Sequence, residues 1–284
     1  GTEERRPSFY MSTTKGVYYC HTCHETGTLR RFLHAMGVDQ STTQLNYRLV
    51  LEEVAKNLPP LRDHISPQGV FNTDPIDEAM LGLFAHDVSS LLQAFSPEAL
   101  KHFEVGWDGW WNRFIFPVRD IRGELVGLSG RAVYEDQQPR YKVYDKEYVF
   151  WGYPARESWE RGSVLWHIEG VYPKLHHTKA GDPDSYVVVV EGFKAAMRCW
   201  DAGLNVVALL GSYMSENQQW ILESLGCPVY LFLDNNYPGQ RGQANAAKRL
   251  LPHIRGGEVF IIEYPDRLKD DEDAKPDNLT VEEV

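Results

Sequence analysis

The sequence predicts an α/β fold with a parallel sheet covered by helices on both faces, preceded by a smaller α+β unit and an N-terminal β unit. Between residues 185 and 284, strand-sized apolar runs alternate with segments of helical periodicity. Continuous apolar strands of this kind indicate a parallel sheet that is buried on both faces. Between residues 105 and 150, short β-type runs separated by turns indicate a meander instead. A chain of 284 residues is long enough for two or three compact units.

The N-terminal third combines β and helical patterns. Residues 7–24 read as a hairpin leading into CHTC, and residues 26–37 have apolar side chains at helical spacing. From 41 to 104 the pattern is mostly helical, interrupted by a proline-rich bend that links two units. Within it, SPEALKHF predicts a helix with Ser96 as its N-cap and Pro97 at its first position.

Three β segments form the predicted meander, and seven elements form the parallel α/β unit. The meander strands are RFIFPVRD, GELVGLSGRAV and RYKVY, and GSVLWHI in the weakly patterned stretch after them is a candidate for one more strand. In the α/β unit the predicted strands cover 186–190, 205–211, 229–234 and 258–265, and the predicted helices cover 193–203, 215–226 and 239–254.

Two acidic residues stand at strand tips of the predicted parallel sheet. Glu191 directly follows VVVV, and Asp234 directly follows YLFL. Ligands of such sheets bind at the carboxyl ends of the strands, so we expect the two carboxylates to converge there. Neighbouring carboxylates repel one another, and a hard divalent cation removes that cost, with Asn236 as a possible neutral oxygen ligand. The alternative is that each acid only stabilises the N-terminus of the helix that follows it.

Charge and cysteine content limit the function classes. A net charge of −11 argues against a protein that simply coats nucleic acid, although residues 113–146 carry seven basic side chains. Cys199 and Cys227 stand in apolar surroundings and predict buried thiols of a reducing cytoplasm. Cys20 and Cys23 are spaced as half of a zinc site. No apolar run is long enough for a membrane span.

Three blocks of the sequence resemble a known family. VVVVEGFKAAM, VVALLGSYMSENQ and YLFLDNNYPGQRGQANAAKRL look like the TOPRIM domain of DnaG-type and phage primases. WNRFIFPVRDIRGELVGLSGRAV with RYKVY is similar to their basic subdomain, and RRPSFYMSTTKGVYYCHTCHETGTLRRFLHAMG resembles the second half of their zinc ribbon. The resemblance implies a zinc ribbon and trailing helix at 1–40, a linker at 41–75, the N-terminal part of a primase core at 76–184 and a TOPRIM domain at 185–284.

The resemblance also implies site residues. Glu191 matches an acid that assists metal binding and proton transfer, and Asp234 matches a metal-binding acid. Asn236 stands where the family has a second acid, and Ala195 where primases commonly have a further one. A third acid is expected after residue 265, and Asp277 is favoured among the candidates, which include Asp273. Expected nucleotide or template contacts are Arg131, Lys142, Lys194 and Arg119; expected zinc ligands are Cys20 and Cys23, with the first ligand pair ahead of Gly1.

The function implied is that of a phage-like DNA primase. Such an enzyme is a DNA-directed RNA polymerase that makes short primers by Mg²⁺- or Mn²⁺-dependent nucleotidyl transfer, with a structural Zn²⁺. Its expected partners are single-stranded DNA, ribonucleoside triphosphates and a replicative helicase, in the cytoplasm of the cell or of a phage host. One alternative is a weakened TOPRIM protein that binds single-stranded DNA or a replication partner without polymerising. A TOPRIM nuclease is the other.

Overall fold

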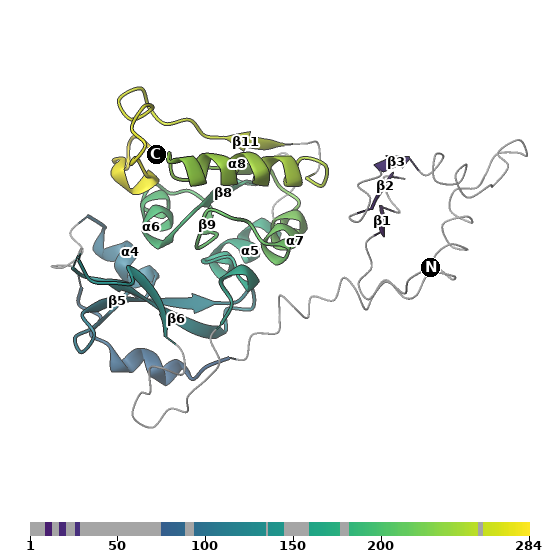
Figure 1. Ribbon diagram of the computed structural model, residues 1–284. Coiled ribbons are helices and arrows are strands. Elements are labelled where there is room, and N and C mark those ends of the chain that lie inside the picture. Colours follow the sequence, from purple (N-terminus) through teal and green to yellow (C-terminus); the bar gives the residue numbers. More distant parts are fainter. Residues whose placement is uncertain are drawn as a thin grey trace, which may run out of the picture. The chain divides into compact units, whose positions relative to one another are not determined.

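The computed structural model describes residues 9–12, 17–20, 26–28, 75–88, 94–134, 136–144, 159–176, 182–254 and 258–284 (Figure 1). The chain divides into two compact units, Gly1–Pro67 and Gln68–Val284. Within the described residues, no helix is long and apolar enough to cross a membrane. The two free cysteines of the second unit, Cys199 and Cys227, are both buried, as the sequence predicts.

The first unit contains a three-stranded antiparallel sheet. Its strands are β1 (Phe9–Ser12), β2 (Val17–Cys20) and β3 (Thr26–Thr28), in the order β1-β2-β3. The pairing of β1 with β2 confirms the predicted hairpin. Cys20 is the last residue of β2, and Cys23 lies outside the described residues. Of the helical segment expected at 26–37, the first three residues form β3 instead, and the rest lies outside the described residues. The zinc ribbon therefore stays a prediction.

An antiparallel sheet opens the second unit and confirms the predicted meander. Its strand order is β4-β5-β6-β7. Helix α4 (Pro97–His102) precedes it, with the Ser96 hydroxyl accepting from Ala99 N and Pro97 in the first turn, as predicted. The 3-10 helix η2 (Glu78–Leu83) covers one face of the sheet. The strands are β4 (Gly106–Asp108), β5 (Arg113–Arg119), β6 (Leu125–Ala132) and β7 (Tyr141–Tyr144).

The parallel sheet follows in the order β11-β10-β8-β9, and all its described pairings are parallel. Strand β8 ends with its apolar run, whereas β9, β10 and β11 end one or two residues before theirs do. The strands are β8 (Val187–Val190), β9 (Val206–Ala208), β10 (Val229–Leu231) and β11 (Val259–Ile261). The helices are α5 (Ile168–His176), α6 (Phe193–Asp201), α7 (Glu216–Leu225) and α8 (Tyr237–Leu250).

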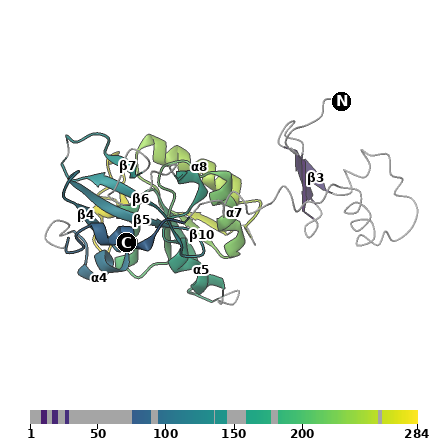
Figure 2. The ribbon, with the colours of Figure 1, turned by 90° about the horizontal axis from the view of Figure 1, so that it is seen from below.

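Both faces of the parallel sheet are covered, as the continuous apolar strands predict. Alternate residues of β8 belong to different clusters: Val187 and Val189 pack with α5, α7 and α8, whereas Val188 and Val190 pack with α6. The cluster that contains Val188, Val190 and α6 also includes residues from one face of the antiparallel sheet. In Figure 1 the antiparallel sheet lies below α6, and Figure 2 shows it from below. This shared core holds the two sheets together and places their edges around one pocket.

The segment between the sheets differs from its prediction. GSVLWHI forms no strand beyond a single bridge between Trp166 and Ala208. A short 3-10 helix, η3 (Arg161–Ser163), precedes that bridge, and helix α5 follows it. Pro173 lies inside α5, and a proline at mid-helix is a strong sequence signal against helix, so pattern reading missed this element.

Candidate active site

Glu191 and Asp234 meet at the carboxyl edge of the parallel sheet. Glu191 is the first residue after β8, and Asp234 follows β10, which is hydrogen-bonded to β8. The backbone N–H of Asp234 donates to Glu191 Oε1 at 3.2 Å. Asp234 is buried, with 8% of its surface exposed. Two acids from separate strands therefore stand side by side, which is the placement that the apolar runs ahead of them indicate.

The N-terminus of α8 packs directly against these acids. A Cβ atom at Gly239 would lie 2.1 Å from the backbone oxygen of Asp234 and 2.6 Å from Glu191 Oε1, so the close approach requires glycine. Asn236 is the N-cap of α8, and its Oδ1 accepts from Gly239 N at 2.9 Å. The Asn236 oxygen that the sequence suggested as a metal ligand thus serves the helix cap.

A third acid and two lysines complete the centre. Asp277 lies in the 3-10 helix η5 (Pro276–Asn278) and forms an ion pair of 2.6 Å with Lys194 of α6. Lys275 forms a second ion pair, 2.9 Å from Asp234 Oδ2. Each of these two acids is therefore matched by a lysine. Among the residues that the structure describes, no three acidic, histidine or cysteine side chains are grouped closely enough to hold a metal ion.

The acids have perturbed pKa values. Burial, followed by the charge of Asp234, raises the pKa of Glu191 to about 7. Burial also raises the pKa of Asp234, although the ion pair with Lys275 counteracts it. For Lys275, burial alone would lower the pKa, but the nearby carboxylates outweigh it and raise that pKa. With a pKa of about 7, Glu191 is partly protonated at neutral pH, so a cation that binds there would release protons.

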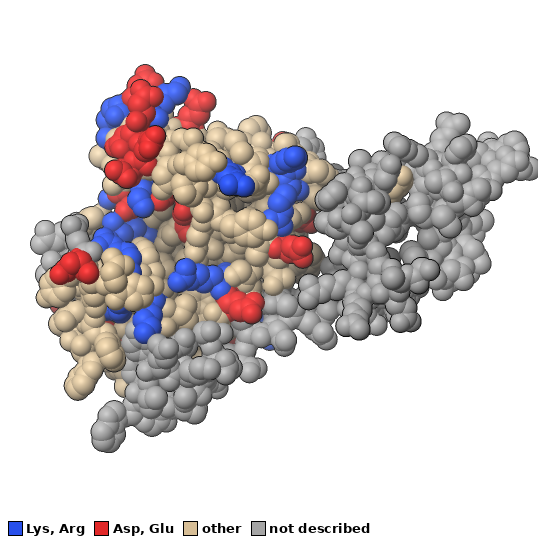
Figure 3. Space-filling model, in the orientation of Figure 1, with Lys and Arg blue, Asp and Glu red and all other residues tan. Residues whose placement is uncertain are grey.

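These residues line a cavity of about 480 Å³ that has two oppositely charged walls. The antiparallel sheet and the segment after it contribute Ser129, Arg131, Arg140, Tyr141, Trp159 and Arg161, three of them basic and none acidic. The opposite wall holds Glu191, Asp234, Asp273 and Asp277, with Lys194 and Lys275 among them. In Figure 3 acidic side chains gather over the C-terminal segment, and basic ones lie below them on the same face.

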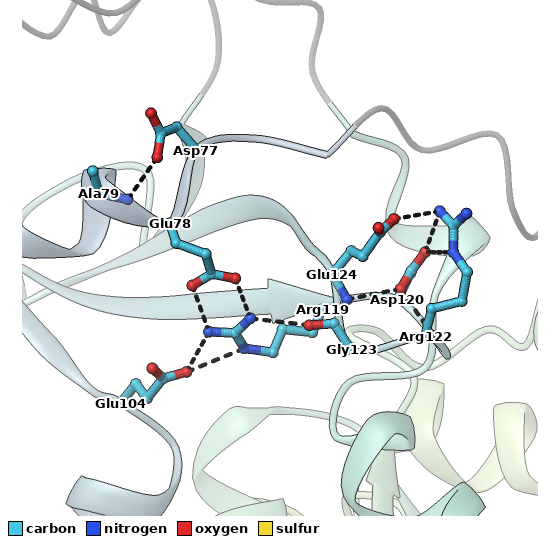
Figure 4. Close-up of polar contacts among 9 residues, drawn as sticks. All are labelled: Asp77, Glu78, Ala79, Glu104, Arg119, Asp120, Arg122, Gly123 and Glu124. Atoms are coloured by element: carbon cyan, nitrogen blue, oxygen red, sulfur yellow. Dashed lines mark hydrogen bonds and ion pairs between the residues drawn. The ribbon is translucent and has the colours of Figure 1, made fainter.

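Of the four basic residues predicted to contact nucleotide or template, Arg131 and Lys194 line this cavity. Lys142 is half-buried on β7 opposite Gly130 and is not among the lining residues. Arg119 lies outside the pocket lining, in a network of ion pairs. Its guanidinium binds Glu78 at 2.6 Å, Glu104 at 2.6 Å and the backbone oxygen of Gly123 at 3.0 Å (Figure 4).

Sequence reasoning singled out neither Arg161 nor Lys275 as a site residue. Arg161 belongs to the weakly patterned stretch before α5. Lys275 lies in an acid-rich tail, where nothing in the local sequence marks a lysine as a site residue. Arg140 was visible in the sequence as part of the basic segment, although its position in the pocket was not. The signal available for Asn236 was the pattern Asn-Tyr-Pro-Gly, which is typical of a helix N-terminus.

The donor set suits a hard divalent cation. Carboxylate oxygens are the preferred ligands of Mg²⁺, and the charge of Asp234 helps to raise the pKa of the neighbouring Glu191. Lys275 supplies the compensating positive charge at Asp234 in this arrangement. An ion bound by Glu191 and Asp234 would take over that role, and Asp277 lies close enough to raise the pKa of Asp234.

Comparisons with known proteins agree with this geometry. Residues 188–274 match a family model described as Toprim-like. The chain is 28% identical, over 309 aligned positions, to a DNA primase from Aquifex aeolicus (strain VF5), covering 95% of the chain and 58% of that relative. A DNA primase from Staphylococcus aureus (strain MSSA476) is 26% identical over 328 positions, covering 95% of the chain and 50% of the relative. The chain is related to the DnaG-type primases. It spans about half the length of these curated relatives.

Solved structures of primases share the fold. One contains the zinc-binding and RNA polymerase domains of the Aquifex aeolicus primase, with a TM-score of 0.56, 19% identity and coverage of 98% of this chain and 72% of that one. Another is a DnaG catalytic domain bound to single-stranded DNA, with a TM-score of 0.54, 18% identity and coverage of 75% and 74%. The second unit therefore has the fold of a primase catalytic core with a TOPRIM domain.

Proposed function

We propose that this chain synthesises short RNA primers on a single-stranded DNA template by divalent-metal-dependent nucleotidyl transfer. The observation that carries the proposal is the two-walled pocket, in which Glu191 and Asp234 face a wall of arginines. Acids at converging strand tips suit cation binding, and arginines suit phosphates. The relatedness to DNA primases selects primer synthesis among the reactions that such a pocket supports.

In this reaction a 3′-hydroxyl attacks the α-phosphate of a ribonucleoside triphosphate, and pyrophosphate leaves. Mg²⁺ or Mn²⁺ would lower the pKa of the hydroxyl and neutralise charge on the leaving group. Glu191 and Asp234 would hold the ion, and Asp277, which is paired with Lys194 in this structure, would be a further ligand. The resemblance to primases also gives Glu191 a part in proton transfer, so Glu191 is the proposed acceptor of the hydroxyl proton. Asn236 keeps Gly239 and the α8 terminus in place against both acids.

The basic wall binds the polyanionic reactants. Arg131 lies on β6 and Arg140 directly precedes β7; the two segments are joined by a hydrogen bond in which Ala132 N donates to Arg140 O at 2.8 Å. Planar guanidinium groups bind phosphate oxygens in pairs. Lys194 lies on the acidic wall, where it is paired with Asp277. Once that ion pair opens, its ammonium group could bind the triphosphate. A zinc ion held by Cys20 and Cys23, a helicase partner and a phage-like setting stay predictions from the resemblance.

Incubation of the protein with single-stranded DNA, labelled ribonucleotides and Mg²⁺ or Mn²⁺ tests the proposal. We expect short RNA products that disappear in Asp234→Ala and in Glu191→Ala. Asp270→Ala is the matched control, because Asp270 is an exposed acid outside the pocket lining, and its products should equal those of the wild type. Template binding without any products would favour the non-polymerising alternative, and template cleavage would favour the nuclease.

A further inference from the structure

The turn between β4 and β5 displays aromatic side chains to solvent. Trp110 is 87% exposed, more than any other large hydrophobic residue that the structure describes, and Trp111 is 47% exposed. Tyr134, on the neighbouring turn after β6, is 59% exposed. We call these three residues the aromatic tip. Burying rings of this size is strongly favourable, so a rigid cluster of them at the surface indicates a binding site.

Buried polar contacts hold the aromatic tip in place. The carboxylate of Asp108 is buried, and its Oδ1 accepts from the backbone N–H groups of Trp110 at 2.9 Å and Trp111 at 3.2 Å. Its Oδ2 accepts from the hydroxyl of Tyr144 at 2.7 Å. The exposure of the tryptophans is therefore a property of an ordered turn, which presents the rings at a low cost in conformational entropy.

Two hydrogen bonds join the turns that carry the aromatic tip. Val133 N donates to Asn112 O at 3.1 Å, and the side chain of Gln137 donates to the backbone oxygen of Trp111 at 2.8 Å. Tyr134 is thereby held next to the tryptophan turn. Both turns lie at the same end of the β5–β6 pair, where Arg113 pairs with Ala132.

The aromatic tip adjoins the basic wall of the pocket. Arg131 lies on β6, three residues before Tyr134, and pairs with Phe114, which follows the tryptophan turn. Arg140, at the other end of the Tyr134 loop, also lines the pocket. The aromatic rings and the guanidinium groups thus lie next to one another. Together they suit a ligand in which planar apolar groups, which stack on rings, alternate with negative charges, which bind guanidinium groups.

We propose that Trp110, Trp111 and Tyr134 stack on unpaired bases of a single-stranded nucleic acid whose phosphates lie along Arg131 and Arg140. The proposal rests on the primer synthesis proposed above and deepens it, because it gives the template strand a defined entry beside the pocket. Stacking tolerates any base sequence, since every base has a π face. The site would therefore bind the template strand without a preference for its base sequence.

Fluorescence anisotropy with two labelled oligomers of equal length tests this site. One is a deoxythymidine oligomer, and the other has the same backbone with abasic residues throughout. We expect Trp110→Ala to weaken binding of the deoxythymidine oligomer about tenfold and to leave binding of the abasic oligomer unchanged. Trp110→Phe should keep most of the affinity. Tyr213→Ala removes another exposed aromatic, outside the pocket lining, and should change neither affinity.

The possible outcomes separate this site from the function on which it rests. If the wild type binds the oligomer and makes primers but Trp110→Ala has wild-type affinity, the stacking site is wrong and the primase proposal stands. An equal loss for both oligomers also refutes stacking. If the wild type binds no single-stranded DNA, both proposals fall. Self-association of the wild type that Trp110→Ala abolishes, seen by analytical ultracentrifugation, would assign the aromatic tip to a second copy of the chain and refute stacking.

Discussion

Divalent-cation binding should depend strongly on pH between about 6 and 8, because Glu191 must be ionised to bind the ion. Its pKa is raised to about 7 by burial first and then by the charge of Asp234. With that value the ionised fraction of Glu191 rises from about one tenth at pH 6 to about nine tenths at pH 8. The apparent affinity for Mg²⁺ or Mn²⁺ should therefore increase about tenfold over this range, equivalent to about 1.4 kcal/mol.

Isothermal titration calorimetry at about pH 6, 7 and 8 measures this dependence. Repeating each titration in buffers of different ionisation enthalpy gives the number of protons released, which should be largest at the acidic end. Glu191→Gln is the matched control, since it keeps the shape of the side chain and removes the ionisation. Its residual affinity should be weak and nearly constant over the range. An unchanged affinity in the wild type, or the full pH slope retained in Glu191→Gln, would refute the assignment to Glu191.

Three further predictions follow from single contacts. Lys275→Gln should strengthen Mg²⁺ binding about five- to tenfold in alkaline buffer, because it releases Asp234 from its ion pair. Lys269→Gln, which changes a lysine outside the pocket lining, should have no effect in the same calorimetry. Arg119→Ala should lower the free energy of unfolding by about 1–2 kcal/mol in urea titrations, with Arg119→Lys intermediate, and nucleotide affinity unchanged; a selective loss of nucleotide binding would contradict its structural assignment. Burial lowers the pKa of His167 to about 4, so below about pH 6.5 the unfolded chain takes up a proton that the folded chain does not, and stability falls as the pH drops towards 4. His167→Asn should remove up to about 3 kcal/mol of that difference in urea titrations over this pH range, and an equally steep loss of stability in the variant would exclude His167 as its source.

Sequence reasoning works best where a local pattern has one physical explanation. The buried valine run before Glu191 and the apolar run before Asp234 place both acids at strand ends, and parallel pairing then brings them together. Ser96 ahead of Pro97 defines the start of α4 in the same local way. These features depend on side chains close in sequence, so no knowledge of the tertiary fold is needed to predict them.

Features that depend on distant partners were not accessible in this way. Arg119 looks like any basic residue at the end of a strand, and its role follows from Glu78 and Glu104, which lie 41 and 15 residues away in the chain. Lys275 takes its significance from Asp234, on another element altogether. Ion pairs of this kind are formed by the assembled fold, so a single sequence contains no local signal for them.

The central claim is that Glu191 and Asp234 share one divalent-cation site, and a crystal structure of the protein soaked in Mn²⁺ tests it most directly. Anomalous scattering would locate the ion independently of the protein atoms. We predict a peak within about 2.5 Å of a carboxylate oxygen of both residues, with Lys275 turned away from Asp234. A peak that contacts neither acid, or no peak in the pocket at a concentration that supports primer synthesis, would contradict it.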